Sequence, residues 1–217
     1  MPAWRREFTD DPEMLAFFER VLRPGDVVVD VGASIGGVAL PAARIGCRVL
    51  AIEPELENFE RLRANIALNG LAVELLRLAI TDRMGTAVLY VFPRARRGHH
   101  SLAPSEAATG SQAVECTTID ALLERQRIER VDLLKIDVEG AEPEVLAGAA
   151  GALARGAIRT VVFEISRDPL RRMGHRVEDV LRPLRAAGYS IRTLDGEAIV
   201  GVPEWEFANL VAVAPGD

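Results

Sequence analysis

The sequence has 217 residues, 49% hydrophobic and 27% charged, and its formal net charge is −6. That composition is typical of a globular chain with enough residues for one sizeable core. The negative balance disfavours a protein that coats nucleic acid by neutralising phosphates, so a small-molecule partner is expected first.

The N-terminal residues 1–24 predict a covering helix. Asp10 and Asp11 precede Pro12, which is typical of a helix start, and apolar residues then recur at helical spacing until Pro24 and Gly25. No apolar run reaches the roughly 20 residues that a bilayer requires, so neither membrane insertion nor secretion is predicted.

Strands and helices then alternate up to residue 78. The strands are expected at 27–29, 48–52 and 73–78, and the helices at 35–45 and 56–68. The first strand is a run of three valines, which suits a parallel strand buried on both faces. Regular alternation of this kind predicts a doubly wound α/β sheet.

The middle of the chain interrupts the alternation. Residues 87–92 and 114–117 are expected to be paired strands, whereas 93–113 lacks periodicity and is interpreted as a lid or insertion. The alternation resumes with strands at 131–136, 160–165, 189–194 and 210–214 and helices at 119–123, 141–153 and 177–187. About seven core strands in one domain, residues 1–217, are therefore predicted.

Both cysteines, Cys47 and Cys116, are flanked by strand-like residues. Buried thiols are therefore expected rather than a disulfide or a metal pair, and a reducing cytoplasm is the expected compartment.

The strongest local signal lies where the first predicted strand ends, in the segment Asp30-Val-Gly32-Ala-Ser34-Ile-Gly36. Glycines at such a turn allow close approach of a ligand to the backbone beyond the carboxyl end of a strand. Ser34 occupies the second glycine position of the G-x-G-x-x-G fingerprint, so a dinucleotide is disfavoured. The carboxylate of Asp30 suits the ammonium group of S-adenosylmethionine, the cofactor predicted here.

Further cofactor contacts are expected at the ends of the next two strands. Glu53, followed by Pro54, lies about 20 residues beyond the loop, where an acid can accept hydrogen bonds from ribose hydroxyls. Asn58 belongs to the following helix, and Asn65 in that helix is expected to make a polar contact near the loop. Ala79 and Asp82 lie where the chain passes the expected adenine. Asp82 can accept a hydrogen bond from the adenine amino group.

The segment Lys135-Ile-Asp137-Val-Glu139-Gly140-Ala-Glu142 follows a predicted buried strand. With it the chain resembles the FkbM family of S-adenosylmethionine-dependent methyltransferases, whose signature reads K-I-D-x-E-G-x-E. The resemblance covers roughly residues 24–165, although the family usually has asparagine where Ser34 stands. It is consistent with a Rossmann-like class I fold, a seven-stranded, mostly parallel sheet with helices on both faces. It also implies methylation of a hydroxyl on a small molecule, natural product, sugar or lipid-like acceptor.

Methyl transfer to a hydroxyl needs the oxygen held near attack distance, roughly 3 Å, and relieved of its proton. Asp137 is the expected catalytic residue, with Glu139 as the alternative base. His100, beside His99 in the segment 93–113, can supply an imidazole that titrates near neutral pH. Lys135 is expected to pair with Asp137 or Glu164, and Glu164 is alternatively an acceptor-binding acid.

Three other functions remain open from the residues alone. They are methyl transfer to nitrogen, a non-catalytic interaction module that keeps the fold, and RNA methylation served by the arginines at 94–97. No metal-ligand spacing is recognisable, so no metal is predicted. The oligomeric state is not predicted.

Overall fold

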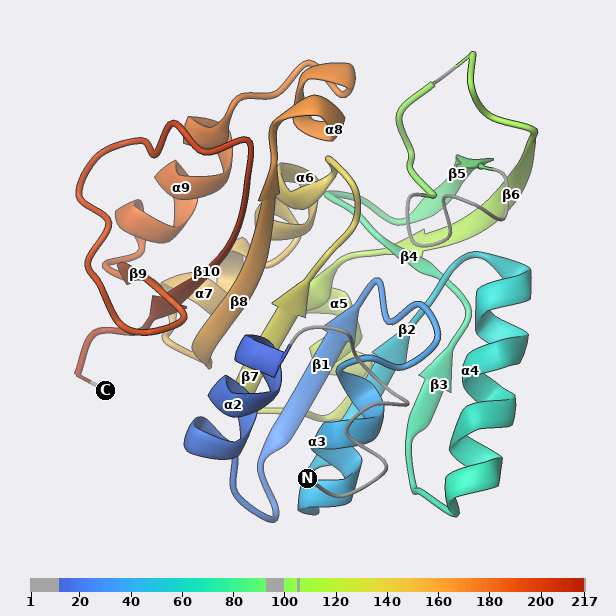
Figure 1. Cartoon of the computed structure of the whole chain (residues 1–217), viewed down its shortest axis with the longest axis horizontal. Helices are drawn as coiled ribbons and strands as arrows, with labels where there is room; N and C mark the ends of the chain where they lie inside the picture. The colour runs from blue at the N-terminus through green and yellow to red at the C-terminus, as the bar shows by residue number, and fades with distance from the viewer. Residues whose placement is uncertain (1–11, 93–99, 105, 217) are drawn as a thin grey trace.

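The computed structural model describes residues 12–92, 100–104 and 106–216. Seven strands form one sheet in the order β3-β2-β1-β7-β8-β10-β9 (Figure 1), which confirms the predicted α/β class and the predicted number of core strands. The pairs β3-β2, β2-β1, β1-β7 and β7-β8 are parallel, and β10 runs antiparallel to both of its neighbours. The strand bounds are β1 Val27–Val31, β2 Arg48–Ile52, β3 Glu74–Leu76, β7 Val131–Ile136, β8 Ile158–Ser166, β9 Ser190–Thr193 and β10 Phe207–Val213.

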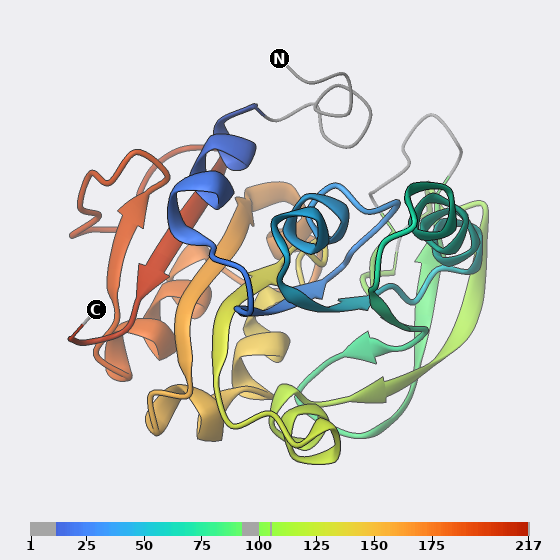
Figure 2. The same cartoon turned by 90° about the horizontal axis from the view of Figure 1, so that it is seen from below.

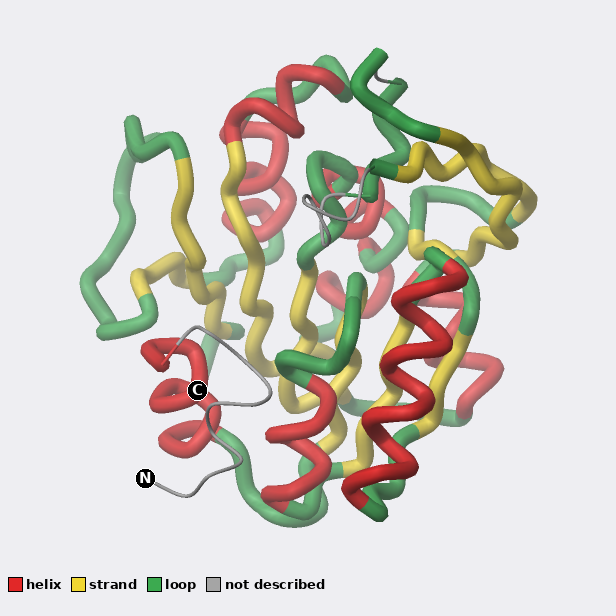
Figure 3. Tube along the Cα trace, turned by 45° about the vertical axis from the view of Figure 1, so that its right-hand side comes forward, coloured by secondary structure: helices red, strands yellow, loops and turns green. Residues whose placement is uncertain are grey.

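Helices cover both faces of this sheet (Figures 2 and 3). One face packs against α2 (Pro12–Val21), α3 (Ala39–Ile45) and α4 (Leu56–Asn69). The other packs against α5 (Ile119–Gln126), α6 (Glu142–Ala147), α7 (Ala150–Ala154) and α9 (Val177–Ala186). The valines of β1 are buried on both faces of the sheet by these helices. Val28 and Val29 point to opposite faces, and both are 0% exposed.

A second, three-stranded sheet has the order β4-β6-β5, with β4 Ala79–Ile80, β5 Gly85–Val91 and β6 Gly110–Thr117. β5 and β6 pair antiparallel, as expected for the two interrupting strands. The boundaries differ from the prediction, because β6 begins at Gly110 and therefore takes in the end of the segment interpreted as a lid. Residues 93–99 and 105 of that segment, His99 and the arginine cluster included, lie outside the described residues.

Two helix predictions need correction, and one helix was not predicted. The helix expected at 35–45 begins only at Ala39, because Gly36, at φ +108°, sits in a turn that precedes it. The helix expected at 141–153 is two short helices that meet at Gly148. A Cβ added to Gly148 would lie 2.1 Å from the Thr81 carbonyl oxygen, so the chain there packs against another loop. An additional helix, α8 (Arg167–Arg172), had no periodic signal in the sequence.

Within the described ranges, no helix is both long and apolar enough to cross a bilayer. Cys47 and Cys116 are buried free thiols, as predicted. That the whole chain forms a single domain stays a prediction.

Candidate functional site

A cavity opens at the carboxyl ends of β1, β2 and β7. In the sheet order, the chain runs outward from β1 through β2 to β3 on one side and from β7 to β8 on the other. The carboxyl edge beside such a reversal is where open α/β sheets bind ligands.

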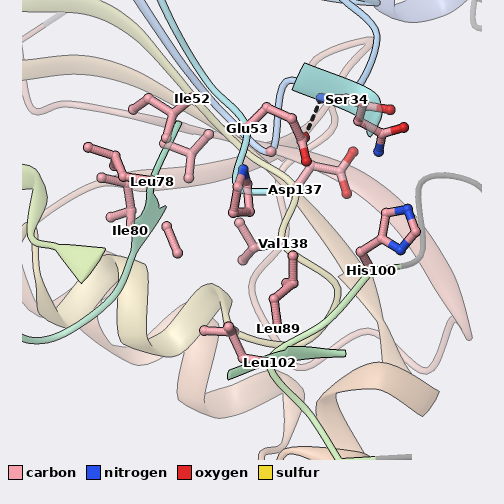
Figure 4. A pocket seen from close by; sticks show the side chains of 16 residues that line it. Ser34, Ile52, Glu53, Leu78, Ile80, Leu89, His100, Leu102, Asp137 and Val138 are labelled. Atoms are coloured by element: carbon pink, nitrogen blue, oxygen red, sulfur yellow. Dashed lines mark hydrogen bonds between the residues drawn. The ribbon is translucent and has the colours of Figure 1, made fainter. Parts of the chain in front are cut away.

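The cavity has an apolar end and a polar end, which Figure 4 shows on opposite sides. The apolar side chains come from both sheets and from the loop after β7, and they are Ile52, Leu78, Ile80, Leu89, Leu102 and Val138. The polar side chains that line the cavity are Ser34, Glu53, Asn58, His100 and Asp137. This division suits a ligand with a flat apolar group at one end and charged groups at the other.

The glycine loop after β1 brings its backbone close to the end of β7. Gly32 has φ +84°, and a Cβ there would lie 1.8 Å from the Asp137 carbonyl oxygen, so only glycine fits. Gly36 has a different role: a Cβ on it would collide with Leu40 and Leu62 at 2.8 Å, so this glycine allows the loop to pack against the helices.

Glu53 at the end of β2 holds the loop in place. Its Oε2 accepts a hydrogen bond from the Ser34 backbone N–H at 2.8 Å, and its Oε1 accepts one from the Glu55 N–H at 2.8 Å. Ser34 itself has φ +48°, an uncommon conformation for a residue other than glycine. Burial raises the pKa of the Glu53 carboxyl to about 7, although these two hydrogen bonds favour its charged form.

The side chain of Asn65 supports the same loop from α4. The amide of Asn65 donates to the Ile35 carbonyl oxygen at 2.9 Å, so the predicted polar contact of Asn65 near the loop is confirmed. Asn58 is 3% exposed, and its backbone N–H donates to the Glu55 carboxylate that caps α4.

Asp30 is almost fully buried, at 1% exposed. Its Oδ2 has no hydrogen-bond partner among the described residues. Burial raises the pKa of this carboxyl to about 7, against the opposing effect of Lys135. A buried carboxyl oxygen without a hydrogen bond usually lowers stability. Such an oxygen indicates a position where a cationic ligand or a water molecule can donate a hydrogen bond.

Three carboxyl groups meet where β7 and β8 end. One oxygen from each of Asp137, Glu139 and Glu164 lies within 4.8 Å of the others, a grouping that can hold a metal ion. The absence of a metal, expected from the sequence, stays a prediction. Burial and the neighbouring acids raise the pKa of Glu139 to about 8 and that of Glu164 to about 9.

Lys135 lies beneath this carboxyl cluster. Its side chain is 4% exposed, and its Nζ lies 3.4 Å from Asp137 Oδ2, so the expected pairing with Asp137 is confirmed. The register of the sheet explains the contact. Lys135 pairs with Asp30 on β1 and with Val162 on β8. Because side chains two residues apart along a strand lie on the same face, Asp137 follows Lys135, and Glu164 follows Val162, on that face.

Hydrogen bonds fix the loop that follows β7. Glu142, the first residue of α6, accepts hydrogen bonds from the backbone N–H groups of Val138 and Gly140 at 3.0 to 3.2 Å. The Ser101 hydroxyl donates to the Glu139 carbonyl oxygen at 2.7 Å. Ser101, within the predicted lid, therefore contacts the signature loop directly.

The structure brings together most of the residues expected to bind the cofactor. Those that line the cavity are Gly32, Ser34, Glu53, Pro54, Asn58, Ala79 and Asp137, and the catalytic candidate His100 lines it too. Asp30, Gly36 and Glu139 lie beside it without lining it. Asp82 does not line this cavity; it lines another hollow and pairs with Arg83, and its contact with adenine stays a prediction. Leu89 and Leu102 were missed, because nothing in their local sequence shows that β5 and residue 102 fold over the cavity.

His100 lies at the polar end of the cavity (Figure 4). Its Nδ1 accepts a hydrogen bond from the Phe92 backbone N–H at 3.2 Å. That bond anchors the imidazole to the end of the smaller sheet, so His100 has a defined place at the site.

Comparison with known proteins gives consistent results. The family model of the methyltransferase FkbM domain matches residues 30–191. The chain is 29% identical over 163 residues to the hexuronic acid methyltransferase AglP of Haloferax volcanii, an alignment that covers 75% of this chain and 65% of AglP. It is 34% identical over 179 residues to the 31-O-demethyl-FK506 methyltransferase FkbM of Streptomyces tacrolimicus, covering 66% of each. The chain thus spans slightly less than two thirds of these relatives.

Solved structures show the same fold at low sequence identity. One is magnesium protoporphyrin IX methyltransferase from Synechocystis, solved with S-adenosylmethionine bound. Its superposition on this chain has a TM-score of 0.53 and 16% sequence identity, and it covers 97% of this chain and 89% of that enzyme. An rRNA methylase structure from Clostridium thermocellum, described as putative in its name, has a TM-score of 0.57 and 9% identity, with 93% of each chain covered.

Proposed function

Because the chain belongs to the FkbM family of S-adenosylmethionine-dependent methyltransferases, we propose that it methylates a hydroxyl oxygen of a small molecule, natural product or sugar. Two relatives support this acceptor class by name, since one acts on a hexuronic acid and the other on position 31-O of a demethylated FK506. The observation that carries the proposal is the Asp137 carboxylate, which lines the donor cavity with a side chain 35% exposed.

The residues around the cavity fit the donor. The apolar end offers Leu78, Ile80 and Leu89 to an adenine ring, and Glu53 lies where ribose hydroxyls are bound in related sheets. Asp30, with its unpartnered buried oxygen, fits a cationic amino group held directly or through water. When bound, S-adenosylmethionine supplies a methyl group that is open to nucleophilic attack because it is attached to a positively charged sulfur.

Asp137 is proposed to orient the acceptor hydroxyl and accept its proton. A general base must lie within hydrogen-bond reach of that hydroxyl, and Asp137 is the carboxylate that both lines the cavity and reaches solvent. Lys135, 3.4 Å from Asp137, fixes the direction of that carboxylate. Glu139, 7% exposed, and His100, which also lines the cavity, are the alternative bases.

The test is a methylation assay with isotopically labelled S-adenosylmethionine and three acceptors: methyl glucuronide, a secondary cyclic alcohol and the matching secondary amine. Mass spectrometry measures the labelled product, and mild alkali distinguishes an ether, which survives, from a methyl ester, which is cleaved. Alkali-stable labelling of a hydroxyl compound supports the proposal. Labelling of the amine alone would favour nitrogen transfer, and donor binding without labelling of any acceptor would favour a non-catalytic module.

A further inference from the structure

The smaller sheet meets the signature loop, residues 137–141 between β7 and α6, at Ser101. The Ser101 hydroxyl donates a hydrogen bond to the Glu139 carbonyl oxygen at 2.7 Å and accepts one from the Ala103 backbone N–H at 3.1 Å. Ser101 is 1% exposed, so both bonds are shielded from water. A buried hydroxyl that is satisfied as donor and as acceptor favours one arrangement of the segments it joins.

The backbone of Ser101 is fixed as well. Its N–H donates to the Tyr90 carbonyl oxygen at 3.2 Å, and its carbonyl oxygen accepts from the Tyr90 N–H at 2.8 Å, which makes an antiparallel bridge to β5. Every polar group of Ser101 therefore has a hydrogen-bond partner. The residue joins β5 to the signature loop through its backbone on one side and its hydroxyl on the other.

Glu139 has an uncommon backbone conformation. Its φ is +56°, in the left-handed region that favours glycine, and Gly140 follows with φ +105°. A residue other than glycine keeps such a conformation where neighbouring groups hold it. Ser101 supplies a direct hold, because the carbonyl oxygen that accepts its hydroxyl hydrogen belongs to Glu139 itself.

Other hydrogen bonds reach the signature loop from the larger sheet and the helix that follows. The Asp137 N–H donates to the Val31 carbonyl oxygen of β1 at 3.0 Å. Glu142, the first residue of α6, accepts from the N–H groups of Val138 and Gly140. The bond from Ser101 adds a contact from the smaller sheet, so the loop is held from both sheets.

The residues on either side of Ser101 line the donor cavity (Figure 4). His100 lies at the polar end of the cavity and Leu102 at the apolar end. Asp137 and Val138 of the signature loop line the same cavity. A ligand in the cavity therefore contacts both of the segments that Ser101 joins.

We propose that Ser101 is a positioning residue for methyl transfer. Its hydroxyl holds Glu139 in the left-handed conformation and thereby keeps the Asp137 carboxylate directed into the cavity. Ser101 itself does not line the cavity, so it acts through the loop. This role rests on the proposed function, because Asp137 is the group that Ser101 positions. A displacement of about 1 Å at a reacting group can lower a rate by about 100-fold, so one buried hydrogen bond at this place has a measurable effect.

The experiment compares Ser101→Ala with Tyr189→Phe in the full chain. Tyr189→Phe is the matched control, because it also removes a buried hydroxyl that donates to a backbone carbonyl oxygen. That oxygen belongs to Ile158, the first residue of β8, at the end of the strand away from the site. If Ser101→Ala fails to fold, Ser101→Cys replaces it, because a thiol fills a similar volume and is a weak donor.

The first readout is amide hydrogen exchange with S-adenosylhomocysteine bound, which needs no acceptor. The N–H groups of Val138 and Gly140 should exchange about fivefold faster in Ser101→Ala, because the loop loses one of its hydrogen bonds. In Tyr189→Phe they should exchange at the wild-type rate.

The second readout is steady-state kinetics with the acceptor found in the labelling assay. In Ser101→Ala, kcat per binding site counted by calorimetry should fall by about tenfold or more. The Kd for S-adenosylhomocysteine should change by less than about threefold, because the backbone of Ser101 keeps its pairing with β5. A general loss of stability would not produce this division between turnover and binding, and Tyr189→Phe should keep the wild-type kcat.

Unchanged exchange in Ser101→Ala would overturn the inference and leave the proposed function intact. Faster exchange with wild-type kcat, or an equal fall of kcat in Tyr189→Phe, would also overturn it. If the wild type labels no acceptor, the proposed function fails, and the exchange readout decides separately whether Ser101 holds the loop.

Discussion

At the scale of single residues, the site depends on a few side chains with distinct tasks. Asp137 reaches the cavity and pairs with Lys135, whereas Glu53 uses both carboxyl oxygens to hold the backbone around the glycine loop. The first position is therefore suited to chemistry on the acceptor and the second to shaping the donor site. Substitutions at the two types of position should separate turnover from binding.

Asp137→Asn should reduce kcat by about 100-fold or more, because an amide cannot take up the acceptor proton. The Kd for S-adenosylhomocysteine should change by less than about threefold, since the amide is nearly isosteric. Steady-state kinetics with the acceptor found in the labelling assay, together with calorimetry, measure the two quantities. Unchanged turnover would transfer the role of base to Glu139 or His100, or favour an amine acceptor.

Asn65→Ala should weaken S-adenosylhomocysteine binding by about five- to tenfold, because one hydrogen bond that holds the loop at Ile35 is lost. Asn69→Ala is the matched control: its amide donates within the same helix, to the Asn65 carbonyl oxygen at 2.8 Å. Fluorescence or calorimetric titration of both variants tests this. Equal weakening in the two would mean that α4 as a whole, rather than the contact to the loop, supports binding.

At the scale of elements, the site is assembled from the carboxyl ends of strands and from the segments that cross between the two sheets. The segments after β1, β2 and β7 supply Ser34, Glu53 and Asp137 to the polar end, and β5 with the residues after it supplies His100 and part of the apolar wall. The junction of α6 and α7 packs tightly against the loop that follows β4, through Gly148 and the Thr81 carbonyl oxygen.

Gly148→Ala should destabilise the protein by about 1–3 kcal/mol, because its Cβ would lie 2.1 Å from a backbone oxygen. At a helical position alanine ordinarily stabilises a protein relative to glycine. The sign of the change in unfolding free energy therefore tests the packing at Gly148. Gly201→Ala, with no atom within 4 Å of its added Cβ, is the control. Urea denaturation followed by circular dichroism gives both values, and a stabilised Gly148→Ala variant would contradict the described junction.

At the scale of the whole molecule, buried acids link stability to pH. Burial raises the pKa of Asp30, Glu53 and Glu142 to about 7, that of Glu139 to about 8 and that of Glu164 to about 9. A carboxyl whose pKa is raised on folding binds more protons in the native state than in the unfolded chain. The stability that such a carboxyl contributes to the folded state is fully present below its pKa in the unfolded chain, near 4. That stability is lost as the pH rises through the pKa of the carboxyl in the folded protein.

The melting temperature should therefore fall by about 5 °C or more between pH 6 and pH 9, a window in which exposed acids are already ionised. Glu164→Gln should raise the melting temperature at pH 9 and reduce the slope, because a neutral amide carries no charging cost. Differential scanning fluorimetry across this range, with Glu129→Gln at an exposed position as the control, measures both. A flat wild-type profile would show that these carboxyls lose their protons without cost in the folded state.

The sequence by itself determined the alternation of elements, the glycine loop after the first strand and the acids that close the next strands. These features are local, because burial period, turn residues and strand ends are set by neighbours in the chain. For the same reason, positions at strand ends were enough to predict that Asp137 and Glu53 lie at the cavity and that Lys135 pairs with Asp137.

Only the tertiary structure decided how distant segments combine. Leu89 and Leu102 line the cavity because the smaller sheet folds over it, and no local pattern in either segment encodes that contact. The separation of α6 from α7 follows from the packing of Gly148 on Thr81, and Glu164 joins Asp137 and Glu139 because β8 pairs with β7 in one register. Such contacts join residues tens of positions apart, and their geometry is fixed by close packing across elements, which spacing along the chain does not specify.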